Sequence, residues 1–202
     1  MLFQFDQLTG GDRYHLITQT VTPRPIAWLL TRNENNTYNL APFSFFSAIC
    51  PDPALLVVSI GNKSTETPKD TKANLLREQE CILHIPSGDH INAVNNSAAT
   101  LAYGDSELMS SGLTLADFTE SLPRIAEANV AMHCRLYDIQ SIGESTFSAC
   151  YLEIISVYVN DDILKQENGR NIINNKQLNP LSRLGGNDYA LLGQTVTIKR
   201  PE

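Results

Sequence analysis

Two long β-like segments late in the chain limit the fold most. Residues 130, 132, 134 and 136 are valine, methionine, cysteine and leucine, and they alternate with alanine, histidine and arginine. This is the period-two pattern of a half-buried strand. A second β-rich segment, residues 147–159, follows across a turn at Gly143. The two segments are expected to pair with each other, so the fold must contain a β-sheet.

Shorter apolar segments between turn residues predict further strands at residues 26–31, 37–40, 54–60, 81–86 and 195–198. Helices are expected over residues 13–20 with Asp12 as the cap, from Asp70 or Thr71 to residue 78, and from Asp89. Residues 161–179 are polar and rich in asparagine, which predicts an excursion from the sheet. Many short strands, few helices and no GxGxxG motif indicate a mainly β protein, an antiparallel β-barrel with a few helices, rather than a doubly wound sheet. We expect residues 1–202 to form one domain.

Charge and composition exclude several classes of function. The formal net charge is −7 and the pI is about 5.1, which argues against binding nucleic acid or an anionic membrane surface. The first residues do not resemble a signal peptide, and no apolar run could span a bilayer, so a cytoplasmic location is expected. The four cysteines form no CxxC pair and are expected to be buried, reduced thiols. The scattered histidines give no support for a metal site.

A polar loop that leads into the second helix is the first candidate site. It contains Lys63, Ser64, Thr65, Lys69 and Thr71. Hydroxyl groups, ammonium groups and the free amides of a helix N-terminus together suit a phosphate group. The alternative is an ordinary solvated loop followed by a capped helix.

Two further segments combine proline with aromatic residues. In residues 22–28, TPRPIAW, two prolines fix the backbone around Arg24, and Trp28 has either a core or a site role. In residues 39–46, NLAPFSFF, Pro42 removes a backbone donor beside three phenylalanines. An apolar wall with a few free peptide groups would suit a flat heteroaromatic ring, although a bend packed in the core would show the same pattern.

Together these segments resemble the flavin reductase-like family. The resemblance runs in order through TPRPIAW, NLAPFSFF, Pro51-Asp52-Pro53, Lys69-Asp70-Thr71 with Asn74, and PLSRLGG at 180–186 with Tyr189. It covers most of the chain, from about Tyr14 to Gly193. It implies an FMN-binding split barrel that forms a homodimer, with FMN at the dimer interface.

The resemblance also implies which residues bind FMN. Asn39, Ala41, Ser44 and Phe45 correspond to residues against the isoalloxazine ring, and Pro42 is also expected to bind the cofactor. Thr31 and Ser59 correspond to residues near the ribityl chain or the phosphate. The segment from Lys63 to Thr71, which includes Lys69, meets the phosphate, and Asn74 after it is a further cofactor-binding residue. Arg24 and Arg183 are weaker candidates, for the phosphate or for a second ligand.

The activity implied is a flavin reductase that passes electrons from NAD(P)H through FMN to a flavin or another acceptor. The alternatives are a flavoredoxin-like FMN carrier reduced by a protein partner, and a split barrel that binds another planar ligand such as pyridoxal phosphate or haem. Related reductases carry a histidine before a Gly-Glu-Val, whereas this chain has Thr146-Phe147-Ser148 there. No catalytic acid or base is therefore assigned.

Overall fold

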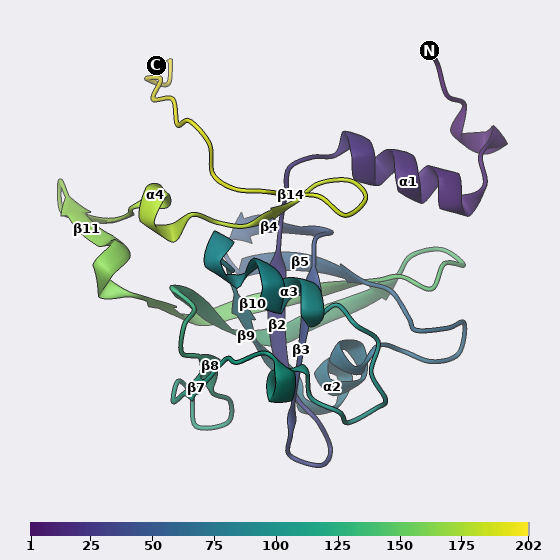
Figure 1. The fold of residues 1–202 in the computed structure, drawn as a ribbon, viewed down its shortest axis with the longest axis horizontal. Helices are drawn as coiled ribbons and strands as arrows, with labels where there is room; N and C mark the ends of the chain where they lie inside the picture. Colours follow the sequence, from purple (N-terminus) through teal and green to yellow (C-terminus); the bar gives the residue numbers. More distant parts are fainter. Residues whose placement is uncertain (202) are drawn as a thin grey trace.

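The computed structural model describes residues 1–201, without the side chains of residues 109 and 110. Its main feature is a seven-stranded antiparallel sheet in the order β3-β2-β6-β9-β10-β5-β4 (Figure 1). These strands are β2 (Ala27–Arg32), β3 (Tyr38–Phe43), β4 (Phe46–Pro51), β5 (Ala54–Ile60), β6 (Glu80–His84), β9 (Val130–Ser141) and β10 (Ser148–Val159). The mainly β prediction is therefore confirmed.

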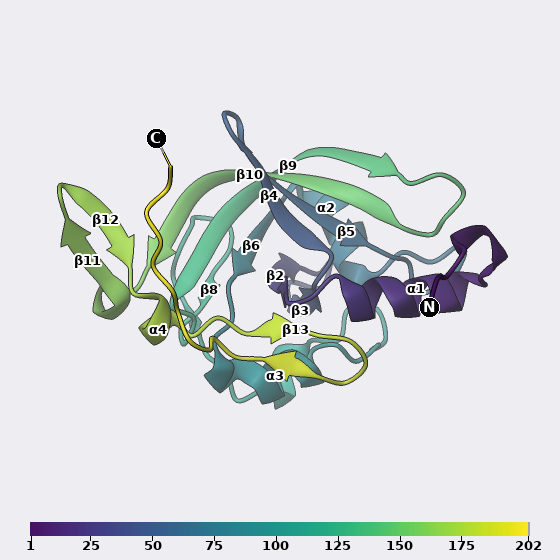
Figure 2. The same cartoon turned by 90° about the horizontal axis from the view of Figure 1, so that it is seen from above.

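The predicted hairpin of β9 and β10 is present and is the longest pairing in the sheet. The two strands run antiparallel from Ser148 opposite Ser141 to Val159 opposite Val130, with two register shifts on the way. Figure 2 shows both strands curving across the molecule. Gly143, in the connecting turn, has a positive φ of 55°, a backbone conformation that favours glycine.

The two edges of the sheet are consecutive in the sequence. β3 and β4 lie at opposite ends of the strand order, yet only Ser44 and Phe45 separate them along the chain. The Ser59 amide donates to the Phe45 carbonyl at 2.8 Å, so this short link still bonds to β5. The sheet therefore curls until its edges approach each other, as in a split barrel.

Helices and small sheets surround this framework. The α-helices are α1 (Gly10–Thr20), α2 (Asp70–Glu78), α3 (Ile91–Asn96) and α4 (Asn175–Leu178). The 3-10 helices are η1 (Phe5–Gln7), η2 (Gly88–His90), η3 (Glu107–Ser110) and η4 (Asp161–Ile163). The remaining strands are β1 (Arg24–Pro25), β7 (Leu115–Ala116), β8 (Arg124–Ile125), β11 (Leu164–Glu167), β12 (Arg170–Ile173), β13 (Ser182–Arg183) and β14 (Tyr189–Ala190). In Figure 1, α1 projects away from the sheet.

Several local predictions were wrong. The α1 cap is Thr9, whose side chain accepts from the Asp12 amide, so Asp12 lies inside the first turn instead. Neither Asp70 nor Thr71 caps α2: both lie inside the helix, and the cap residue is Lys69, whose side chain makes no capping hydrogen bond. Residues 195–198 form no strand. By contrast, the predicted excursion from the sheet at 161–179 is present, and it contains η4, the separate β11–β12 hairpin and α4.

The core lies on both faces of β2. Ala27 and Leu29 belong to one buried cluster, whereas Trp28 and Leu30 belong to another. Trp28 is completely buried, and its indole N–H donates to Ser97 Oγ at 2.9 Å, so its role is core packing.

The cysteines are all free thiols, of which three are buried and Cys50 is partly exposed. Among the described residues, no helix is long and apolar enough to cross a membrane.

His84 joins the sheet to the segment at β8. Its Nδ1–H donates to the Trp28 carbonyl at 3.1 Å, and its Nε2 accepts from the Ile125 amide at 3.0 Å. Both bonds require the neutral ring, because Nε2 could not accept after protonation. Burial is the main reason that the pKa of His84 falls to about 4.

We therefore predict an acid-sensitive contribution of His84 to stability. A folded pKa below the unfolded value means that the unfolded chain binds more protons between these values, so stability falls as the pH drops through that window. Between about pH 7.5 and about pH 5.5, the free energy of unfolding of the wild type should fall by about 1 kcal/mol more than that of His84→Gln. Urea unfolding at both pH values measures this difference. His15→Gln, at an exposed position, is the control, and equal pH dependence of His84→Gln and the wild type would contradict the prediction.

Candidate functional site

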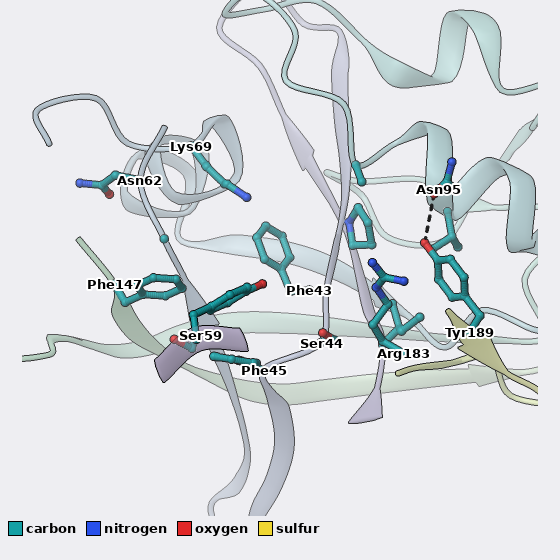
Figure 3. A pocket seen from close by; sticks show the side chains of 16 residues that line it. Phe43, Ser44, Phe45, Ser59, Asn62, Lys69, Asn95, Phe147, Arg183 and Tyr189 are labelled. Atoms are coloured by element: carbon teal, nitrogen blue, oxygen red, sulfur yellow. Dashed lines mark hydrogen bonds between the residues drawn. The ribbon is translucent and has the colours of Figure 1, made fainter. Parts of the chain in front are cut away.

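A cavity of about 310 Å³ opens where the sheet edges meet. Its walls come from α1, the segment from β3 to the 44–45 link, the end of β5, the start of α2, α3, and the β13–β14 hairpin (Figure 3). The lining residues are Tyr14, Ile26, Pro42, Phe43, Ser44, Phe45, Ser59, Gly61, Asn62, Lys69, Val94, Asn95, Ala98, Phe147, Arg183 and Tyr189. None of these described residues is acidic.

Aromatic rings form one wall of this cavity. The rings of Phe45 and Phe147 are stacked at 6.4 Å between centroids, and Tyr14 lies 5.9 Å from Phe45. Gly61 permits this arrangement, since a Cβ there would lie only 3.2 Å from the Phe147 ring. Such a wall offers flat apolar surfaces that suit a planar ring system.

Lys69 supplies positive charge near the start of α2. Its ammonium lies 5.5 Å from the Phe43 ring centroid and has no ion-pair or hydrogen-bond partner in the described part of the chain. Loss of surrounding water lowers the pKa of Lys69, and the nearby charge of Lys63 lowers it further. A bound anion would oppose both effects, because a nearby negative charge favours the charged ammonium.

The first amides of α2 directly follow Lys69 in the chain. No residue in the described range accepts a hydrogen bond from the backbone N–H groups of Asp70 or Thr71. These donors are the free groups of a helix N-terminus, which carries partial positive charge. Together with Lys69 they are suited to hold a phosphate group.

A buried polar network fixes this end of α2 against the sheet. Asn39 Nδ2 donates to Thr71 Oγ1 at 2.9 Å and to Thr31 Oγ1 at 3.3 Å. Asn74 Nδ2 donates to Thr31 Oγ1 at 3.1 Å and to Asn33 Oδ1 at 2.8 Å. These side chains are almost completely buried, so the bonds satisfy groups that water does not reach.

A smaller cavity of about 80 Å³ adjoins the first and shares Pro42, Phe43, Lys69 and Ala98 with it. Both signs of charge occur here. The Lys63 ammonium lies 2.7 Å from the Asp70 carboxylate, so its charge is already paired. Glu107 accepts from the Leu40 amide at 2.9 Å, and burial raises the pKa of Glu107.

The residues predicted from the sequence fall into three groups. Those that line the larger cavity are Pro42, Ser44, Phe45, Ser59, Lys69 and Arg183. Those that line the smaller cavity are Asn39, Ala41, Pro42, Lys63, Lys69 and Thr71. Thr31 and Asn74 line neither cavity and belong to the network behind them. Arg24 is buried and lines neither cavity; it donates to backbone carbonyls and, through Nε at 3.3 Å, to Oγ of the cavity residue Ser44, so it supports the site from behind.

Several cavity residues could not be chosen from the sequence alone. Tyr14, Val94, Asn95 and Phe147 come from segments far apart in the chain, and their meeting depends on how the helices and the hairpin dock on the sheet. Phe147 had one available signal, because it directly precedes the long strand β10.

Comparison with known proteins agrees with this geometry. A family model described as "Flavin reductase like domain" matches residues 19–179. The uncharacterized protein YwrF of Bacillus subtilis is 34% identical over 99% of this chain and 98% of its own length.

Two solved structures are similar along the whole chain. Nitrilotriacetate monooxygenase component B from Bacillus cereus is 30% identical, has a TM-score of 0.90, and is matched over 98% of both chains. The 2-nitrobenzoate 2-nitroreductase NbaA of Pseudomonas fluorescens is 27% identical, with a TM-score of 0.88 over 100% of this chain and 96% of that one.

Proposed function

This chain belongs to the flavin reductase-like family, and we propose that it binds FMN with the ring in the larger cavity and the phosphate reaching the adjoining smaller one, and that it passes electrons from NAD(P)H to a flavin or another acceptor. The observation that carries the proposal is the unpaired Lys69 ammonium at the open N-terminus of α2, beside an aromatic wall. A phosphorylated planar ring needs both features in one place.

The residues present fit FMN. Lys69, the amides of Asp70 and Thr71, and the Thr71 hydroxyl would hold the phosphate. Phe45 and the other rings of the wall would pack against the flat ring. FMN bound in this way would supply the redox chemistry, and the protein would position it and exclude water.

The electron acceptor and donor are inferred from the similar structures and from the charge of the cavity. The two similar solved structures are named as a monooxygenase component and as a nitroreductase. Both names support an oxidoreductase, in which reduced flavin serves either a partner enzyme or a small acceptor. We favour NAD(P)H as the donor because the cavity is positive in an otherwise acidic chain, and a pyridine nucleotide is an anion.

We also propose that the protein works as a homodimer in which the second copy covers α1. Thr18 is the one buried residue of α1, whereas Tyr14 and Ile17 on this helix and Val21 after it are exposed. An isolated helix of this length is marginal, so an apolar partner would stabilise it. Because Tyr14 also lines the cavity, a partner here would lie close to the bound ligand.

The first prediction concerns the phosphate end. Lys69→Gln should weaken FMN binding by about tenfold or more, because a charge-assisted hydrogen bond is lost. Titration of purified apoprotein followed by flavin fluorescence measures the dissociation constant. Lys165→Gln, at an exposed position on β11, is the charge-matched control. If Lys69→Gln binds FMN as tightly as the control does, the phosphate lies elsewhere.

The second prediction concerns electron transfer. Anaerobic addition of NADH or NADPH to the FMN-loaded protein should bleach the visible flavin band. Dithionite is the positive control for a reducible cofactor. If neither nucleotide bleaches the flavin band but dithionite does, the protein would instead be a carrier of the flavoredoxin kind, reduced by a protein partner.

The third prediction concerns the dimer. Ile17→Glu should shift the protein from dimer to monomer in light scattering, since it places a charge in the apolar contact. His15→Glu adds the same charge at another exposed position of α1 and should leave the mass unchanged. A wild-type protein that is monomeric at all concentrations would refute this proposal.

A further inference from the structure

The larger cavity has a second positive group that phosphate binding at Lys69 leaves unused. Arg183 enters the cavity from β13, and Figure 3 shows Lys69 and Arg183 on different sides of Phe43. With no acidic residue among the described lining, the cavity is positive although the chain has a net charge of −7. Two separate cations suit two anionic groups.

The Arg183 guanidinium retains donors that the protein does not satisfy. Its Nη1 donates to the Asp188 carbonyl at 2.9 Å, and its Nη2 donates to the Gly186 carbonyl. The described residues offer no carboxylate partner to Arg183, and its remaining N–H groups have no acceptor among them. The Tyr189 ring packs on its face, with 4.6 Å between Cζ and the ring centroid. The plane of the guanidinium is therefore fixed while part of its edge stays free.

The hairpin that carries Arg183 is held firmly. Arg24 Nη2 donates to the Leu184 carbonyl at 2.8 Å, and Arg24 Nη1 donates to the carbonyls at the end of α1. Gly185 approaches Gln19 so closely that a Cβ would lie 2.3 Å from its side chain. The Tyr189 hydroxyl donates to Asn95 on α3 at 3.4 Å. Such anchoring is what a recognition group needs in order to keep its direction.

Arg24 and Arg183 also repel each other. Burial is the main cause of the lowered pKa of Arg24, and the charge of Arg183 lowers it further. Neither guanidinium has an ion-pair partner among the residues described. An anion beside Arg183 would offset this repulsion, which gives the pair a preference for a negatively charged ligand.

We propose that Arg183 is a specificity-determining residue that receives the carboxylate of a planar aromatic acid, the second small molecule to enter the cavity. The inference rests on the proposed function, because it takes FMN as the first occupant. A planar guanidinium edge matches a carboxylate through two parallel hydrogen bonds. The Lys69 end instead offers an ammonium, helix amides and a hydroxyl, a combination that suits a phosphate.

Benzoate is the probe that tests this assignment. It should bind the FMN-loaded protein and perturb the visible flavin spectrum, whereas the uncharged analogue benzamide should bind much more weakly. Arg183→Leu should lose about tenfold or more in benzoate affinity, and Arg183→Lys should recover part of it. Arg170→Leu removes one exposed charge from β12 and is the matched control.

Three results would overturn the inference. Benzoate could fail to bind the wild type, or it could bind Arg183→Leu as well as the control. Alternatively, Arg183→Leu could weaken FMN binding or raise the KM for NADH while benzoate affinity stays unchanged, which would assign Arg183 to a phosphate group. FMN affinity is measured first in each variant. Calorimetry then measures benzoate binding with and without FMN, so that a protein that does not bind FMN is distinguished from one in which Arg183 does not bind the carboxylate.

Discussion

The site depends on the buried bonds that fix the first turn of α2 to the sheet. Asn39 on β3 and Asn74 on α2 donate to hydroxyl groups that have no access to water, and together they tie the helix to β2 and β3. Breaking one of these bonds would leave a buried polar group unpaired. The direction of the α2 N-terminus, and with it the place of Lys69, therefore follows from packing inside the protein.

Charge is distributed in a way that separates structure from binding. Lys63 forms an ion pair with Asp70, and Arg24 donates hydrogen bonds to backbone carbonyls. These two cations therefore hold loops in place. Lys69 and Arg183 lack acidic partners among the described residues and face the same cavity. An unpaired positive cavity in an acidic protein favours anionic ligands in that cavity.

The sequence predicted the framework better than the site. Strand β5 was predicted at its observed bounds, and the β9–β10 hairpin was predicted from its alternation, because both patterns are local. The tail at 195–198 has strand-like residues but pairs with no other strand in the described part of the chain, and such residues alone do not make a strand. Cavity residues such as Val94 and Asn95 could not be chosen, since nothing local marks a residue that contacts another segment more than fifty positions away.

The short segment that joins the two edge strands β3 and β4 also forms part of the cavity wall. Pro42 lies on edge strand β3, where a missing backbone donor is tolerated. The chain then passes through Ser44 and Phe45 directly to the other edge, and these residues line the cavity. A fully closed barrel would bury this link and fill the space with side chains. The opening between β3 and β4 is therefore a consequence of the fold itself, and the helices and hairpin around it are free to vary in the groups that they present.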